Sequence, residues 1–109
     1  MTVQIYRTTG SDNFGSDFGL KDQIRRASVS VMSNIAEGFE SLTNPVFARY
    51  LGHAKASAGE IRSQLYLAYD LEYITGEEFD SLIGLVEKIS RQLFNLIKYL
   101  KGLDRRDRI

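Results

Sequence analysis

One histidine and a group of carboxylates are the side chains in this sequence with the most potential for chemistry. His53 is the only histidine, and the chain contains no cysteine. Arg49, rather than a carboxylate, lies one helical turn before His53, so a metal ion bound there would lack ligands. A single imidazole without partners at helical spacing is typical of a solvent-facing or interface residue. We therefore expect no metal site.

Three carboxylates, Glu77, Glu78 and Asp80, cluster directly after Thr75 and Gly76. Paired carboxylates can carry out acid–base catalysis, but the first turn of a helix also favours negative charge for purely structural reasons. The sequence has no nucleophile elbow, no phosphate-cradling glycine loop and no zinc-binding helix motif. We therefore expect a protein that is not an enzyme and that has neither catalytic nor cofactor-binding residues.

Clusters of basic residues offer a different kind of function, because lysine and arginine bind phosphates. Arg25 and Arg26 lie near Asp22, so a salt-bridged helix face and phosphate binding both remain open. A second basic group lies close to the C-terminus, and a bundle places it at the end remote from the acidic turn near residue 75. The candidate nucleic-acid residues are Arg25, Arg26, Lys98, Lys101, Arg105, Arg106 and Arg108.

The charge and composition of the whole chain limit these functions. Fourteen basic and fourteen acidic side chains cancel, which is unusual for a dedicated nucleic-acid-binding protein. No stretch approaches the roughly eighteen apolar residues of a membrane span, and the N-terminus lacks the apolar run of a signal peptide. Without cysteine, the fold needs no oxidising compartment. We expect a soluble cytoplasmic protein that makes no membrane contact.

The elements that position these side chains are helices, because the apolar residues recur by threes and fours rather than by twos. The pattern predicts one helix over about residues 17–39, a second that begins near residue 44, and a third over about residues 76–102. Their apolar seams are Leu20, Ile24, Ala27, Val31 and Ile35; Phe47, Leu51, Ala54, Ala58, Ile61, Leu65 and Ala68; and Phe79, Leu82, Val86, Ile89, Leu93, Leu96, Leu100 and Leu103.

Capping residues mark where these helices begin. Thr75 and Glu78 have the spacing of a capping box, and Pro45, after a cap at Thr43 or Asn44, suits the first turn of a helix. The segment 10–15 has the composition of a loop, which leaves residues 2–7 as a first helix of about two turns. The sequence therefore predicts an all-α fold: an up-down antiparallel four-helix bundle with a shortened first helix, in a single domain over residues 1–109.

Two polar residues, Ser30 and Asn34, lie among the apolar residues of the helix over 17–39. If buried, they need hydrogen-bond partners. We expect Ser30 to bond to its own backbone. Asn34 either does the same or fixes the register between neighbouring helices, as a buried asparagine does in coiled coils.

One flank of the helix that follows Pro45 carries an unusual pattern. Small residues recur along it at spacings of four, three and four, and tyrosines continue the same flank. Small residues permit another helix to approach closely, and tyrosines suit a partly hydrated contact. This flank is either a contact between subunits or part of the packing within the bundle. The candidate oligomer-interface residues are Gly52, Ala56, Gly59, Ser63, Tyr66, Tyr69 and Tyr73.

Four blocks of the sequence resemble one bacterial protein family. These blocks are Phe18–Ala27, Ser33–Glu40, Ala54–Tyr66 and Asp70–Ile74. Together they resemble the four-helix-bundle proteins related to the ribosomal-RNA intervening-sequence protein, from about Val3 to Lys101. That family is similar to the accessory variability proteins of diversity-generating retroelements, which form ring-shaped pentamers and bind a reverse transcriptase with its nucleic acid.

The resemblance implies how the chain acts. It implies a homo-oligomer, most simply a homopentamer, that binds a reverse transcriptase or another protein. It also implies a first helix longer than residues 2–7 can form, so we expect apolar surface to be exposed between the second and fourth helices. The predicted function is a non-enzymatic oligomeric scaffold that binds a protein or ribonucleoprotein partner. Direct RNA or DNA binding through the basic end of the bundle is the alternative.

Overall fold

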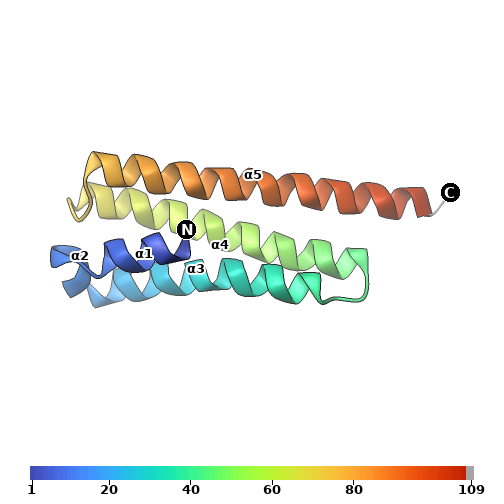
Figure 1. Cartoon of the computed structure of the whole chain (residues 1–109), viewed down its shortest axis with the longest axis horizontal. Coiled ribbons are helices and arrows are strands. Elements are labelled where there is room, and N and C mark those ends of the chain that lie inside the picture. The colour runs from blue at the N-terminus through green and yellow to red at the C-terminus, as the bar shows by residue number, and fades with distance from the viewer. Residues whose placement is uncertain (108–109) are drawn as a thin grey trace.

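The computed structural model describes the backbone of residues 1–107, together with every side chain in that range except those of Asp12 and residues 104–107. This described part of the chain forms five helices and no strand (Figure 1). The helices are α1 (Thr2–Thr9), α2 (Asp12–Ser16), α3 (Phe18–Phe39), α4 (Asn44–Asp70) and α5 (Gly76–Asp107). The predicted all-helical bundle is confirmed.

Helix α4 is the central helix of the bundle. It runs antiparallel to α3 on one side and to α5 on the other, and it packs along both (Figure 1). Helices α1 and α2 lie against α3, at the end of the molecule that holds the turn between α4 and α5. The bundle is elongated, with principal extents of 56, 21 and 17 Å. Within the described residues, no helix combines the length and apolar character that crossing a membrane requires.

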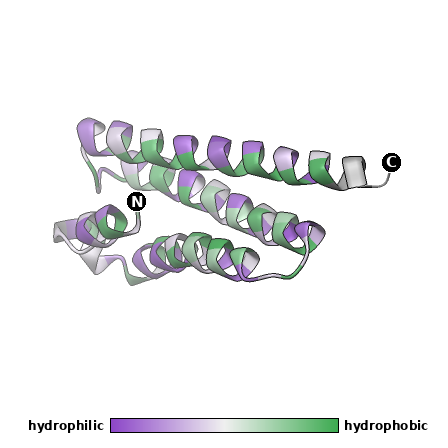
Figure 2. Cartoon of the chain, turned by 45° about the vertical axis from the view of Figure 1, so that its right-hand side comes forward, coloured by the Kyte–Doolittle hydropathy of each residue, from purple (hydrophilic) through white to green (hydrophobic). Residues whose placement is uncertain are grey.

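The hydrophobic core follows the predicted seams. On α4, Leu51, Ala58, Ile61 and Leu65 are completely buried, and apolar residues line the facing sides of the helices (Figure 2). The predicted seam residues of α3 and α5 are also buried or partly buried, with one exception. The prediction is wrong for Leu96, which is 37% exposed, because α1 is too short to cover that part of α5.

The helix ends are capped much as predicted. The Glu78 N–H donates to Thr75 Oγ1 at 3.1 Å, and the Thr75 N–H donates to Glu78 Oε1 at 2.9 Å, which confirms the capping box. Thr43 Oγ1 accepts a hydrogen bond from the Val46 N–H at 3.4 Å, and Pro45 lies in the first turn of α4. At its other end, α5 continues past the predicted residue 102 to Asp107.

The prediction that residues 10–15 form only a loop is wrong, because α2 begins at residue 12. The cause is Phe14, which is completely buried and whose ring centroid lies 5.4 Å from that of Tyr73. Burying an aromatic side chain contributes roughly 1.5–3 kcal/mol, whereas one glycine in a helix costs about 1 kcal/mol. Tertiary burial therefore outweighs the local composition.

A polar contact joins α3 to α4. The hydroxyl oxygens of Ser30 and Ser57 are 2.9 Å apart, and Asn34 Nδ2 donates to the carbonyl and hydroxyl oxygens of Ser30 at 2.8 and 3.0 Å. Asn34 thus bonds within its own helix. Ser30, expected to bond to its own backbone, makes the link to α4 instead. Because a buried hydroxyl needs a partner, this link favours one register of α3 on α4.

Helix α1 covers one part of the space between α3 and α5 and leaves the rest open. Beyond its N-terminal end lies a groove of about 550 Å³, which we call the apolar groove. Its lining residues are Met1, Thr2, Val3, Val31, Met32, Ile35, Leu51, Ile89, Gln92, Leu93 and Leu96. The expectation of a short first helix with exposed apolar surface beside it is confirmed.

Gly38 allows the end of α3 to lie close against α4. A Cβ at this position would lie 2.9 Å from both Phe47 Cδ1 and Tyr50 Cβ. We predict that Gly38→Ala lowers the free energy of unfolding by about 1–3 kcal/mol in urea denaturation, because Tyr50 Cβ cannot move without its backbone. The control is Gly84→Ala, where a Cβ meets nothing within 4 Å and stability should rise by up to about 1 kcal/mol. Equal losses in both variants would contradict this packing argument.

Glu72 ends α4 in the left-handed conformation, with a φ of 61°. Its N–H donates to the Tyr69 carbonyl at 3.0 Å, and the Tyr73 N–H donates to the Ala68 carbonyl at 2.9 Å. Glycine is the usual residue in this motif. We predict that Glu72→Gly raises the free energy of unfolding by about 1 kcal/mol, because the strain on Cβ is removed. Glu72→Ala keeps that strain, so an equal gain from both variants would point to charge removal instead.

Candidate functional site

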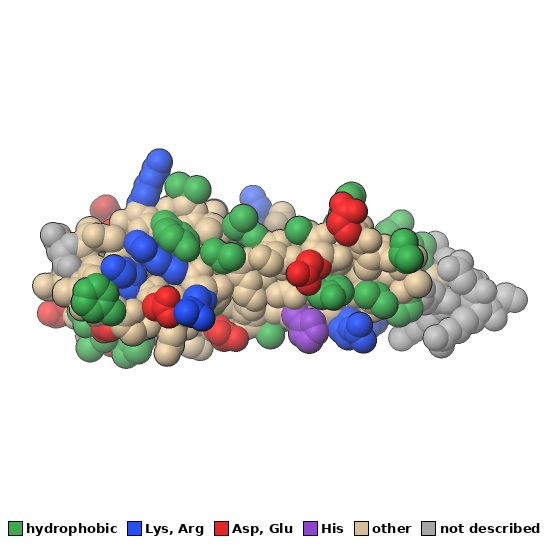
Figure 3. All heavy atoms as spheres, turned by 90° about the horizontal axis from the view of Figure 1, so that it is seen from below, with side chains coloured by type: hydrophobic (Ala, Val, Ile, Leu, Met, Phe, Trp, Pro, Cys, Tyr) green, Lys and Arg blue, Asp and Glu red, His purple; other side chains and the backbone are tan. Residues whose placement is uncertain are grey.

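The described residues do not assemble a metal site. Among them, no three side chains of His, Cys, Asp or Glu lie close enough together to hold a metal ion. His53 is exposed on α4, and its ring centroid lies 6.3 Å from that of Tyr50. The histidine is visible at the molecular surface in Figure 3. It faces solvent in the single chain, and a place in an interface stays a prediction.

The acidic residues near the turn between α4 and α5 include two with structural roles. Glu78 belongs to the capping box. Asp17 caps α3 by accepting the Leu20 N–H at 3.1 Å, and its second oxygen accepts the Tyr73 hydroxyl at 2.9 Å. This hydrogen bond, with burial and the carboxylate charge, raises the pKa of Tyr73 above its ordinary value of 10.0. The phenol stays protonated at neutral pH and ties the α4–α5 turn to α3.

Arg25 joins α1 to α3. Its Nε donates to Thr9 Oγ1 at 2.8 Å, its Nη2 donates to the Tyr6 carbonyl at 3.0 Å, and its guanidinium lies 4.5 Å from the Tyr6 ring centroid. The last carbonyl groups of a helix have no partner within it, so Arg25 satisfies the end of α1. Only part of this guanidinium remains available for a phosphate.

Arg26 faces solvent instead. Its Nε lies 2.8 Å from Asp22 Oδ2, and both side chains are largely exposed. An exposed pair of this kind contributes about 0–1 kcal/mol, so it is easily exchanged for another anion. Lysine and arginine side chains gather toward the left end of the face seen in Figure 3, which is the end that carries the turn between α4 and α5. That end is therefore not acidic on all sides.

The predicted basic end is described only in part. Lys98 and Lys101 are exposed on α5, and Lys98 Nζ lies 5.5 Å from the centroid of the Phe94 ring. The side chains of Arg105 and Arg106, and all of Arg108, lie outside the described part of the chain. Phosphate contacts by these three arginines stay a prediction.

The structure divides the candidate oligomer interface into two halves. Its small residues, Gly52, Ala56, Gly59 and Ser63, are exposed on α4, and we call them the α4 flank. A Cβ at either glycine would meet nothing within 4 Å. The tyrosines also have partners within the chain. Tyr66 meets the Phe79 ring edge to face and Tyr69 packs against it at a tilt, with centroids 5.0 and 4.8 Å apart, and Tyr73 packs on Phe14. Tyr66 and Tyr69 are nevertheless 46% and 44% exposed, so a contact of the aromatic half with another subunit stays a prediction.

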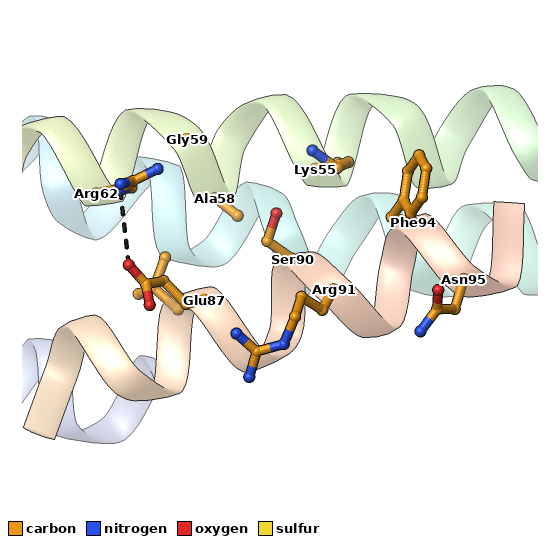
Figure 4. Close-up of a pocket in the computed structure, with 10 residues that line it drawn as sticks. Lys55, Ala58, Gly59, Arg62, Glu87, Ser90, Arg91, Phe94 and Asn95 are labelled. Atoms are coloured by element: carbon orange, nitrogen blue, oxygen red, sulfur yellow. Dashed lines mark ion pairs between the residues drawn. The ribbon is translucent and has the colours of Figure 1, made fainter.

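Sequence reasoning missed a groove between α4 and α5 of about 600 Å³, which we call the charged groove (Figure 4). Its lining residues are Lys55, Ala58, Gly59, Arg62, Val86, Glu87, Ser90, Arg91, Phe94 and Asn95. One signal was present, because Lys55, Gly59 and Arg62 have the four-and-three spacing of a single helix face. The pairing of that face with Arg91 depends on how α5 packs.

This combination of sequence and fold occurs in a described protein family. Residues 1–95 match the 23S rRNA-intervening sequence protein family. The chain belongs to this family. A crystal structure of a protein with unknown function from the S23 ribosomal protein family of Bacteroides thetaiotaomicron superposes with a TM-score of 0.80. That protein is 29% identical, and the alignment covers 89% of this chain and 88% of the other.

Neither the family description nor the similar structure assigns a reaction to this helical bundle. The similar structure is described as a protein with unknown function, and the family is not one of known enzymes. No curated protein matches the chain.

The role of Arg25 can be tested by removing its donors. We predict that Arg25→Met lowers the free energy of unfolding by about 1.5–3 kcal/mol, the usual range for hydrogen bonds to a charged group. Amide hydrogen exchange should also speed up selectively in α1. Arg26→Met is the matched control, and it should change stability by less than about 1 kcal/mol. If Arg25→Met left the amide hydrogen exchange of α1 unchanged, the proposed role of Arg25 in holding α1 against α3 would be contradicted.

Proposed function

We propose that this family member is a non-enzymatic scaffold that assembles with copies of itself and holds a protein or ribonucleoprotein partner on its surface. The observation that carries this proposal is the apolar groove. Met32 is 54% exposed and Val3 is 60% exposed beside it. Contiguous exposed apolar surface of this kind marks interaction sites on soluble proteins.

The shape of the apolar groove favours a helical partner. Helix α1 already lies against α3 at one end of the groove, with Ile5 completely buried. The walls continue past Met1 along Met32 and Ile35 on α3 and along Ile89 and Leu96 on α5. Amphipathic helices bind such grooves through apolar residues spaced by three and four. A reverse transcriptase is the partner protein that the family resemblance implies.

The α4 flank supports self-assembly. It offers open, small-residue surface on the exposed side of α4, where a second helix can approach closely. Contact between this flank and a different surface of the next subunit is head-to-tail, and such contacts close into rings when the rotation permits. The resemblance to ring-forming proteins supports a homopentamer.

Assembly can be tested by size exclusion coupled to light scattering. We predict a mass several times that of the chain for the unmodified protein, and a smaller mass for Gly52→Leu and Gly59→Leu, because leucine blocks close approach at the α4 flank. Gly84→Leu is the matched control, since Gly84 is also an open position on a helix surface, and its mass should not change.

The same measurement distinguishes the two surfaces. If Met32→Glu with Leu96→Glu lowers the mass while the α4-flank variants do not, the subunit contact lies in the apolar groove. Both residues are exposed, so the charges should leave the fold intact. An unmodified chain that elutes as a monomer at micromolar concentration contradicts self-assembly.

A further inference from the structure

We propose that the charged groove binds single-stranded nucleic acid, with phosphates against Lys55, Arg62 and Arg91 and a base against a neighbouring aromatic ring. The proposal does not depend on self-assembly, but Gly59 belongs to both the charged groove and the α4 flank. Nucleic acid and a second subunit would therefore compete for this position. The proposal places nucleic acid between α4 and α5 rather than at the basic end of the bundle. Grooves that bind single strands combine cations that follow the backbone with aromatic rings on which bases stack.

The α4 wall of the charged groove has a spacing that suits a phosphate backbone. Lys55, Gly59 and Arg62 lie on one helix face, and seven residues span about 10 Å along the helix axis. That length corresponds to roughly three stacked nucleotides at about 3.4 Å each. Gly59 stands between the two cations and has no side chain, so a ligand backbone can approach the helix there.

The charge in the groove is unbalanced. The three cations share the lining with a single carboxylate, Glu87, although acidic and basic residues cancel over the whole chain. Glu87 Oε1 lies 3.9 Å from Arg62 Nε, and both side chains are about half exposed, so this contact is weak. Within the described residues, no carboxylate lies at ion-pair distance from Lys55 or Arg91. Lys55 is also partly buried. An anionic ligand would balance this charge.

An exposed aromatic ring lies beside the cations. Phe94 is 49% exposed, and Figure 4 shows its ring standing beside Lys55 in the charged groove. Lys98 Nζ lies 5.5 Å from the ring centroid, and a neighbouring hollow brings Lys98 together with Tyr99, which is 62% exposed. Two exposed rings and a further cation thus continue along α5 from the three cations of the charged groove.

The remaining lining residues favour nucleic acid over an acidic helix. Ser90 and Asn95 supply a hydroxyl and an amide that can bond to sugars or base edges. A bound helix needs an apolar stripe, and the apolar groove offers the larger apolar surface. In the charged groove, the apolar residues Ala58, Val86 and Phe94 lie among three cations. Because these contacts do not read a fixed base pattern, the groove should show little sequence preference.

Fluorescence anisotropy with a labelled short oligouridylate, measured at low and at physiological salt, tests this proposal. Removing the three cations together, as Lys55→Gln, Arg62→Gln and Arg91→Gln, should weaken binding about tenfold or more at low salt. It should also reduce the slope of log affinity against log salt by about 2, since each phosphate contact on a single strand contributes about 0.7.

Two controls separate the groove from general charge. Removing three exposed cations elsewhere, as Arg7→Gln, Arg49→Gln and Lys88→Gln, changes the net charge equally and should leave most of the affinity. Phe94→Ala should weaken binding several-fold without changing the salt dependence, because it removes stacking rather than charge. Light scattering on the same samples shows whether each variant keeps its assembly, so a failure of the scaffold proposal is recognised independently.

Three results would overturn the proposal. The first is no binding by the unmodified protein at low salt. The second is equal loss of affinity in the two triple variants, which would show an effect of net charge alone. The third is displacement of the oligonucleotide by an acidic peptide at equal concentration with no effect of Phe94→Ala, which would assign the groove to an acidic protein partner.

Discussion

The burial of one side of α4 is the interaction on which the rest of the structure depends. This helix packs along both α3 and α5, and small residues such as Ala54, Ala58 and Ala68 are completely buried in the contact. Small side chains allow both neighbours to come close to the same helix. With α3 and α5 held on either side of α4, a space remains between them, and α1 covers part of it. The apolar groove follows from this arrangement.

The short first helix is stable only because α3 holds it. Eight residues are fewer than the roughly 12–15 that an isolated helix needs. Ile5 supplies the buried apolar contact, and Arg25 binds the open carbonyl end through Thr9 and Tyr6. An arginine that looks like a phosphate ligand in the sequence is therefore committed to the fold. Its neighbour Arg26, one position along the helix, faces solvent.

The two grooves differ in chemistry although α5 lines both. Leu93 and Leu96 face the apolar groove, whereas Arg91 and Phe94 face the charged groove. A helix is about 10–12 Å across with its side chains, so ligands of the two grooves would lie close together on opposite sides of α5.

The sequence alone determined the helices, their seams and their caps, because periodicity and capping depend on residues within a few positions of each other. It indicated the exposed apolar surface through the family resemblance. Tertiary structure decided what depends on residues far apart: the helical turn around the buried Phe14, the use of Arg25 as a tie, and the link from Ser30 to Ser57. It also decided which cations lie together, because Arg62 on α4 and Arg91 on α5 line the same groove only when the two helices pack against each other. A local sequence pattern does not determine how two packed helices are rotated about their axes. The residues that line a groove between them are therefore known only from the tertiary structure.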